Sequence, residues 1–215
     1  MTTIYLIRHS ERLNPYYIEE INSTDSLLVQ NEKDILSVEG ERRAALLADV
    51  EELQDVEKVY TSKCVRTLQT AKYLLNKLDL KATIDERLDE RRVGLPNSQA
   101  HPDWFIKQYQ EIDFKTVGGE SQRDVLNRMN EIINIILETD ENKKVAIFSH
   151  GYAICFYLMQ FAKLNHIDLE KNLTLTYKNK NILEGLLYAP EIFKLEYDGK
   201  KLKSIENLTY LIKNK

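Results

Sequence analysis

Residues 144–148 read Lys-Val-Ala-Ile-Phe, and this stretch decides the class of fold. Four consecutive apolar residues, without the alternation of a half-exposed strand, are typical of a strand that is buried on both faces. Two other short runs share this β-branched and aromatic character, namely Thr3-Ile-Tyr-Leu-Ile7 and Lys58-Val-Tyr-Thr61. The three runs predict strands of a buried, parallel sheet.

Segments with the helical period lie between these strands. Apolar residues recur at helical spacing over residues 38–53, 63–78 and 120–138. Ser37 and Ser62 precede the first two segments and are candidate N-caps. Because strands that alternate with helices form βαβ units, the chain is expected to fold as an α/β sandwich.

The last third of the chain has a different pattern. We expect a helix over residues 152–164, then strands over 173–177 and 191–197, with a hairpin turn at Asp198-Gly199. A further strand and a short helix are expected at 81–84 and 104–111. The predicted fold class is α/β, a three-layer sandwich in one domain over residues 1–215. It has a mainly parallel central sheet, helices on both faces and antiparallel C-terminal edge strands.

Composition limits the classes of protein to consider. The chain has 215 residues, and its 30 Lys and Arg against 34 Asp and Glu give a net charge of −4. This balance offers no attraction to a polyanion, so we expect no nucleic acid partner. The apolar runs are too short to span a bilayer and no basic leader precedes the first strand, so we expect no membrane anchor and a cytoplasmic location. Cys64 and Cys155 lie in helical patterns without metal-ligand spacing and are expected to be reduced core residues.

Histidine and arginine gather where the predicted parallel strands end. The three strands are followed by Arg8-His9-Ser10-Glu11-Arg12, by Ser62-Lys63-Cys64-Val65-Arg66 and by Ser149-His150-Gly151. Because parallel strands deliver the loops that follow them to the same side of a sheet, two of the four histidines and several arginines should meet at one edge. This arrangement predicts a functional site.

These residue types favour phosphate chemistry. Clustered arginines offer rigid, permanently charged forks of N–H donors that match the oxygens of a phosphate. An imidazole nitrogen can attack phosphorus directly, and the cation of Arg8 would lower the pKa of His9 and keep it nucleophilic. Glu90 could give a proton to the leaving alcohol and then take one from water. It lies in a run of carboxylates with Asp89, and the residues alone favour Glu90 over Asp89 only slightly.

The motifs together resemble the histidine phosphatase superfamily, the phosphoglycerate mutase-like group, over about the first three quarters of the chain. They are Leu6-Ile-Arg-His9, Ser62 with Arg66-Thr-Leu-Gln-Thr-Ala71, Leu88-x-Glu90 with Gly94, Gly119-Glu-Ser121 and Ser149-His-Gly151. The resemblance implies that Arg8 and His9 are the signature pair and Arg66 the second phosphate-binding arginine. It also implies that Glu90 is the acid and base, that His150 is the second histidine, and that no metal or cofactor is needed.

The chain departs from the family pattern at several expected substrate contacts. Ser10 stands where the family usually has glycine, and Asn14 lies one residue before the position of a common asparagine. Arg12 matches a third phosphate arginine of related acid phosphatases. Those enzymes follow the second histidine with an acidic proton donor, but Gly151 stands there in this chain, which favours Glu90 as the proton donor.

Other phosphate chemistries lack their motifs. The sequence has no Asp-x-Asp, no Cys-x₅-Arg, no Walker loop and no Gly-x-Gly-x-x-Gly, and Ile147 replaces the first glycine of a hydrolase elbow at Ser149. We therefore expect a metal-independent phosphatase that hydrolyses a small-molecule phosphate ester through a phosphohistidine. The alternatives are phosphoryl transfer of the phosphoglycerate mutase type and a weakly active phospho-ligand binding or regulatory protein. The C-terminal edge strands could pair with another subunit or be covered by the last residues.

Overall fold

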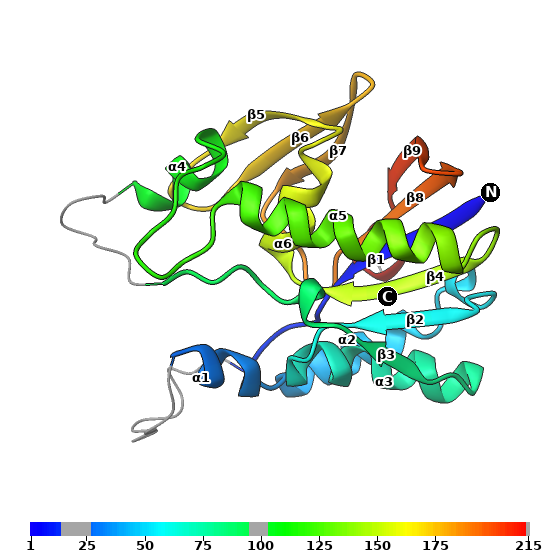
Figure 1. Ribbon diagram of the computed structural model, residues 1–215. Helices are drawn as coiled ribbons and strands as arrows, with labels where there is room; N and C mark the ends of the chain where they lie inside the picture. The colour runs from blue at the N-terminus through cyan, green and yellow to red at the C-terminus, as the bar shows by residue number, and fades with distance from the viewer. Residues whose placement is uncertain (14–26, 95–102, 214–215) are drawn as a thin grey trace.

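A six-stranded sheet with the order β3-β2-β4-β1-β8-β9 runs through the centre of the molecule (Figure 1). The computed structural model describes residues 1–13, 27–94 and 103–213. The six strands are β1 (Thr2–Arg8), β2 (Lys58–Thr61), β3 (Ala82–Ile84), β4 (Lys144–Ser149), β8 (Ile192–Asp198) and β9 (Lys201–Asn207). Strands β1 to β4 are mutually parallel, whereas β8 pairs antiparallel with β1 and β9 antiparallel with β8. This confirms the predicted mainly parallel sheet with antiparallel C-terminal edge strands.

Helices cover both faces of this sheet (Figure 1). They are α2 (Val38–Leu47) and α3 (Val65–Leu78) on one face and α5 (Gln122–Thr139) and α6 (Gly151–Leu158) on the other. Along β1, Tyr5 and Ile7 pack with the α2 and α3 side, while Ile4 and Leu6 pack with the α5 and α6 side. All four side chains are fully buried. Burial on both faces explains the continuous apolar runs and confirms the three-layer sandwich.

The helix starts depend on local capping. Ser37 caps α2 as expected, because its hydroxyl accepts from Gly40 N at 2.9 Å. The sequence reading placed the start of α3 after Ser62, but Cys64 is its N-cap residue. Helix α5 begins after Ser121, which forms a capping box with Asp124. The predicted helix over 38–53 is divided into α2 and a 3₁₀ turn, Glu51–Leu53.

A second, three-stranded antiparallel sheet corrects the sequence reading of the last third. Its strands are β5 (Lys163–Ile167), β6 (Leu173–Tyr177) and β7 (Lys180–Gly185) in the order β5-β6-β7. Helix α6 ends at Leu158 and not at residue 164, and β6 belongs to this sheet and not to the edge of the main one. The predicted helix extended past Leu158 because Met159, Phe161, Ala162 and Leu164 continue its apolar pattern. The pairing of β6 could not be predicted, because a local pattern does not show which strands are its neighbours.

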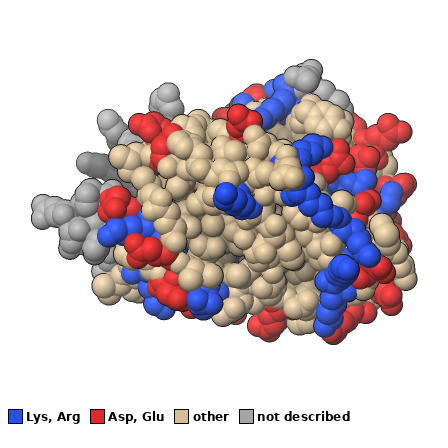
Figure 2. Space-filling view, turned by 90° about the horizontal axis from the view of Figure 1, so that it is seen from above, with Lys and Arg blue, Asp and Glu red and all other residues tan. Residues whose placement is uncertain are grey.

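The turn between β6 and β7 belongs to a β-hairpin that was not predicted from the sequence. Lys178 and Asn179 both have positive φ, which suits the tight two-residue turn of a β-hairpin. The buried side of the hairpin packs into the α5 and α6 side of the main core through residues such as Leu173 and Leu175. Figure 2 shows the outer side of this region, where uncharged residues cover most of the centre around a basic side chain, and charged residues of both signs are interspersed along the rim.

The remaining elements are short. They are α1 (Leu27–Lys33), the 3₁₀ turn η3 (Glu86–Leu88), α4 (Trp104–Gln110) and α7 (Tyr210–Lys213). Helix α4 falls within the predicted segment 104–111. Among the helices of the described residues, none has both the length and the apolar character that a membrane crossing requires.

We propose that both sheets unfold as one cooperative unit, because they share one core. The Ile136→Ala variant removes a fully buried side chain of α5 and should lower the free energy of unfolding by about 2–5 kcal/mol. Its neighbour Ile135 is 38% exposed, so Ile135→Ala should change that free energy by less than about 1 kcal/mol. Urea unfolding, followed by circular dichroism and by tyrosine fluorescence, measures the free energy of unfolding of both variants. Two separate transitions, or equal effects of the two variants, would contradict the shared core.

Candidate active site

Two histidines from distant parts of the sequence meet at the carboxyl edge of the parallel strands. His9 follows β1 and His150 follows β4, and these strands are neighbours in the sheet. The centroids of the two imidazole rings lie 5.3 Å apart, with an angle of 60° between the ring planes. Ser62, which follows β2, and Arg66, in the first turn of α3, contact His150. The structure therefore brings together the residues that the topology placed at one edge.

His9 is held as a neutral imidazole with one nitrogen available. Its side chain is buried, and Nδ1 lies 2.7 Å from the carbonyl oxygen of Ser10. Because a carbonyl oxygen only accepts, Nδ1 must carry the proton, and the lone pair is left on Nε2. Burial, together with the charges of Arg8 and Arg66, holds the pKa of His9 well below its usual value. These conditions suit a nucleophile near neutral pH.

His150 has the opposite tautomer. Arg66 Nη2 lies 2.9 Å from His150 Nδ1, and since a guanidinium only donates, this nitrogen accepts. His150 Nε2 then carries the proton and donates to Ser62 Oγ at 2.8 Å. Burial and the charge of Arg66 hold the pKa of His150 well below its usual value. Both ring nitrogens are thus engaged, so a direct contact with a phosphoryl oxygen would require exchange of the Ser62 bond.

The two arginines are fixed by backbone carbonyls. Arg8 Nη1 donates to the carbonyl oxygens of Leu187 at 2.7 Å and Tyr188 at 2.9 Å. Arg66 is 1% exposed, and its terminal nitrogens donate to the carbonyl and side-chain oxygens of Asn31. Helix α1 therefore contributes to the site through Asn31. Sequence reasoning did not single out this residue, because its contact depends on how the segment before α2 folds back over α3.

Three buried polar groups around His9 lack a partner. They are Arg8 Nε, Arg66 Nε and Ser10 Oγ, and none has a hydrogen-bond partner among the described residues. Buried polar groups are almost always paired, so these are suited to contact the oxygens of an anion. Ser10 itself has an ordinary negative φ, and its amide donates to Thr70 Oγ1 at 2.9 Å. The position therefore does not need the conformational freedom of glycine.

The Glu90 side chain lies beside the N-terminus of α6, the helix that begins directly after His150. Its carboxylate accepts from the backbone N–H groups of Arg91 at 2.9 Å, Ala153 at 3.1 Å and Tyr152 at 3.4 Å. Asp89 accepts instead from the backbone N–H of Lys63 at 3.2 Å. Of the two carboxylates that the sequence left open, Glu90 is the one bound at the helix that begins beside the histidine pair.

The remaining expected contacts have different surroundings. A Cβ on Gly151 would lie 3.2 Å from Arg8 Nε and 3.0 Å from Leu187 Cδ1, so glycine here allows Arg8 to approach the helix. The Arg12 side chain is 49% exposed and pairs with Asp34 at 2.8 Å, so the structure does not place it as a buried phosphate contact. Its charge still contributes to the low pKa of His9. Asn14 lies outside the described residues.

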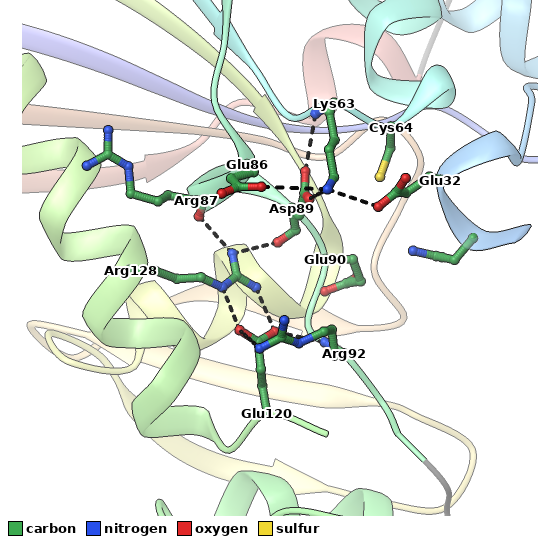
Figure 3. Close-up of a pocket in the computed structure, with 11 residues that line it drawn as sticks. Glu32, Lys63, Cys64, Glu86, Arg87, Asp89, Glu90, Arg92, Glu120 and Arg128 are labelled. Atoms are coloured by element: carbon green, nitrogen blue, oxygen red, sulfur yellow. Dashed lines mark hydrogen bonds and ion pairs between the residues drawn. The ribbon is translucent and has the colours of Figure 1, made fainter. Parts of the chain in front are cut away.

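A strongly charged pocket includes Glu90 in its wall (Figure 3). Nine of its lining residues are ionic, and the full set is Asn31, Glu32, Lys63, Cys64, Glu86, Arg87, Asp89, Glu90, Arg92, Glu120 and Arg128. In the described part of the chain, no three side chains of the His, Cys, Asp and Glu types are grouped so that they could hold a metal ion.

Arg128 holds the loop that carries Glu90. It donates to the carbonyl oxygens of Arg87 at 2.7 Å and Asp89 at 2.8 Å, and its Nε pairs with Glu120 at 2.9 Å (Figure 3). Sequence reasoning also missed this residue. The available signal was a cation three residues after Val125, on the apolar face of α5.

Comparison with known families agrees with this geometry. The sequence model of the histidine phosphatase superfamily (branch 1) matches residues 4–184, and the chain belongs to this superfamily. This confirms the resemblance seen in the motifs. The curated relatives include the probable phosphoglycerate mutase GpmB of Yersinia enterocolitica, 29% identical over 162 residues that cover 72% of each chain. The protein of the same name from Serratia proteamaculans is 28% identical over the same share of each chain.

Solved structures show the same fold at low sequence identity. A mycobacterial glucosyl-3-phosphoglycerate phosphatase superposes with a TM-score of 0.66 over 95% of each chain, at 19% identity. A phosphoserine phosphatase variant from Entamoeba histolytica, in complex with phosphoserine, superposes with a TM-score of 0.67 at 17% identity. That match covers 99% of this chain and 100% of the other. At these identities the similarity establishes the α/β fold.

The low pKa values of the two buried histidines predict how stability depends on pH. Below about pH 6.5 the unfolded chain takes up protons that the folded chain does not, so the free energy of unfolding should fall as pH falls. Each such histidine contributes a slope of up to about 1.4 kcal/mol per pH unit. The His9→Gln variant should therefore lose less stability than the wild type between about pH 7.5 and 5.5, as measured by urea unfolding. Identical slopes for both proteins would show that His9 is not buried as a neutral group.

Proposed function

We propose that the protein is a phosphatase that hydrolyses small phosphomonoesters through a phosphohistidine at His9, without a metal ion. One observation carries this proposal. The buried imidazole of His9 has its Nε2 lone pair available, and Arg8 Nε, Arg66 Nε and Ser10 Oγ are buried and have no hydrogen-bond partner among the described residues. A phosphoryl group would supply oxygens for these groups and a phosphorus atom for the imidazole.

The first step forms the covalent intermediate. His9 Nε2 attacks phosphorus in line with the ester oxygen, and the bond between phosphorus and that oxygen breaks. The protonated Glu90 carboxyl group gives its proton to the leaving oxygen. Arg8 and Arg66 neutralise the charge on the phosphoryl oxygens, and His150 keeps Arg66 in place through its Nδ1 contact.

The second step releases phosphate. The Glu90 carboxylate takes a proton from water, and the water oxygen bonds to phosphorus. The bond between phosphorus and Nε2 breaks and returns its electron pair to the imidazole, so the enzyme is restored with Glu90 protonated. Inorganic phosphate leaves the site.

The relatives support phosphoryl chemistry of two kinds. The structural neighbours include two phosphatases, and the curated relatives are named probable phosphoglycerate mutases. A mutase would use the same phosphohistidine but return the phosphoryl group to another hydroxyl of its substrate. For this reason mutase activity is the second candidate. A phospho-ligand binding protein with little turnover is the third, because Asn14 lies one residue before the position of the family's common asparagine.

Phosphate release from a panel of small phosphate esters should identify turnover by the wild-type protein. His9→Ala should remove that turnover, because alanine has no nucleophilic nitrogen to attack phosphorus. A parallel assay with 3-phosphoglycerate and a bisphosphoglycerate primer measures mutase activity. Isomerisation that clearly exceeds phosphate release would establish the mutase, and calorimetric binding of esters without any product would establish the binding protein. Either result would reject the proposed phosphatase.

A further inference from the structure

Arg91 follows Glu90 in the sequence and is a buried cation with unusual surroundings. It is 4% exposed. Among the described residues, its guanidinium contacts one amide and three aromatic rings. The guanidinium carbon lies 4.3 Å from the ring centroid of Tyr152, 5.3 Å from that of Trp104 and 5.8 Å from that of Phe105. Aromatic faces stabilise a desolvated guanidinium, and here they accompany a guanidinium whose Nε has no hydrogen-bond partner among the described residues.

Two residues of this stack, Arg91 and Tyr152, also hold the Glu90 carboxylate through their backbone N–H groups. The backbone N–H of Arg91 donates to Glu90 Oε1 at 2.9 Å, and the backbone N–H of Tyr152 lies 3.4 Å from Glu90 Oε2. The Arg91 side chain is stacked on the Tyr152 ring, so it fixes the spacing of these two peptide groups. The position of the Glu90 carboxylate therefore depends on the Arg91 side chain, which contacts the Tyr152 ring and Gln108.

The far end of the Arg91 side chain is bound to α4. Arg91 Nη1 donates to Gln108 Oε1 at 2.5 Å, and Gln108 Nε2 donates to the carbonyl oxygen of Glu120 at 2.9 Å. Gln108 is fully buried, and Trp104 and Phe105 are on the same helix. Through Arg91, α4 is connected to the peptide groups that bind Glu90.

We infer that Arg91 is a positioning residue that sets the Glu90 carboxylate for proton transfer and makes its position depend on the docking of α4. This inference rests on the proposed function. A planar guanidinium can stack on Tyr152 and donate to Gln108 at the same time, whereas a lysine ammonium offers neither the plane nor the fork. Loss of Arg91 should thus weaken proton transfer to the leaving group and leave phosphoryl binding by Arg8 and Arg66 intact.

The test compares esters whose leaving groups differ in their need for a proton. Arg91→Met and Arg91→Lys should lower kcat for an alkyl ester, glycerol 3-phosphate, by about 10- to 100-fold. For 4-nitrophenyl phosphate, whose leaving group hardly needs a proton, kcat should fall by less than about 3-fold. KM for both esters should stay within about 2-fold of the wild-type value. Glu90→Gln is the reference variant. It should lower kcat for glycerol 3-phosphate by a larger factor than the Arg91 variants do, and again much more than kcat for 4-nitrophenyl phosphate.

Two further variants make the result specific. Arg123→Met removes a 51% exposed arginine of α5 and should leave both rates unchanged. Gln108→Leu keeps the aromatic rings around Arg91 and removes the amide that accepts its hydrogen bond. It should lower kcat for glycerol 3-phosphate more than for 4-nitrophenyl phosphate, by a smaller factor than the Arg91 variants. If the Arg91 variants do not fold, this variant tests the inference in their place. Equal losses on both esters, or no loss, in folded Arg91 variants would overturn the inference while Glu90→Gln still discriminates. Failure of the wild type to hydrolyse either ester would instead reject the proposed function.

Discussion

A hydrogen bond between a buried guanidinium and a buried imidazole, from Arg66 Nη2 to His150 Nδ1, links the start of α3 to the end of β4. Both groups are buried away from water, so each determines the hydrogen-bonding role of the other. The guanidinium must donate, which fixes the tautomer of His150, and burial together with the charge of Arg66 lowers the pKa of this imidazole. Burial, together with the charges of Arg8 and Arg66, likewise lowers the pKa of His9. Two neutral rings amid fixed positive charge form a site that favours an anion and a nucleophile together.

The order of the strands in the sheet is enough to bring these residues together. Parallel strands β1, β2 and β4 end at one edge, so residues that follow them in the sequence meet without long loops. Helix α6 starts at that edge directly after His150, and its first N–H groups bind Glu90. Gly151 opens the space in which Arg8 lies against that helix. Glu90, Arg8 and His150 are thus arranged around the start of α6.

The sequence predicted those parts that follow from local pattern and strand order. Continuous apolar runs such as 144–148 identify buried strands, and the topology then puts His9, Arg66 and His150 together. Strand β6 was predicted at 173–177 but was assigned to the edge of the main sheet, because a local pattern does not show with which strands it pairs. Strand β7 was not predicted, because Ile182 and Leu183 are its only buried apolar residues. Asn31, Arg91 and Arg128 were missed because their roles come from tertiary contacts with carbonyls and rings. The role of Arg12 as a phosphate contact, expected from motif spacing, stays a prediction; in the structure its exposed side chain pairs with Asp34.

The proposed chemistry depends most on the covalent role of His9, which a single experiment can address. The protein is mixed with a phosphate ester that carries a labelled phosphoryl group, quenched within its first turnover, digested and analysed by mass spectrometry. We expect a label on His9 that is lost in acid and retained in alkali, as a phosphoramidate should be, and that is absent from His9→Ala. Turnover by the His9→Ala variant at the wild-type rate, or a label found only on another residue, would contradict it.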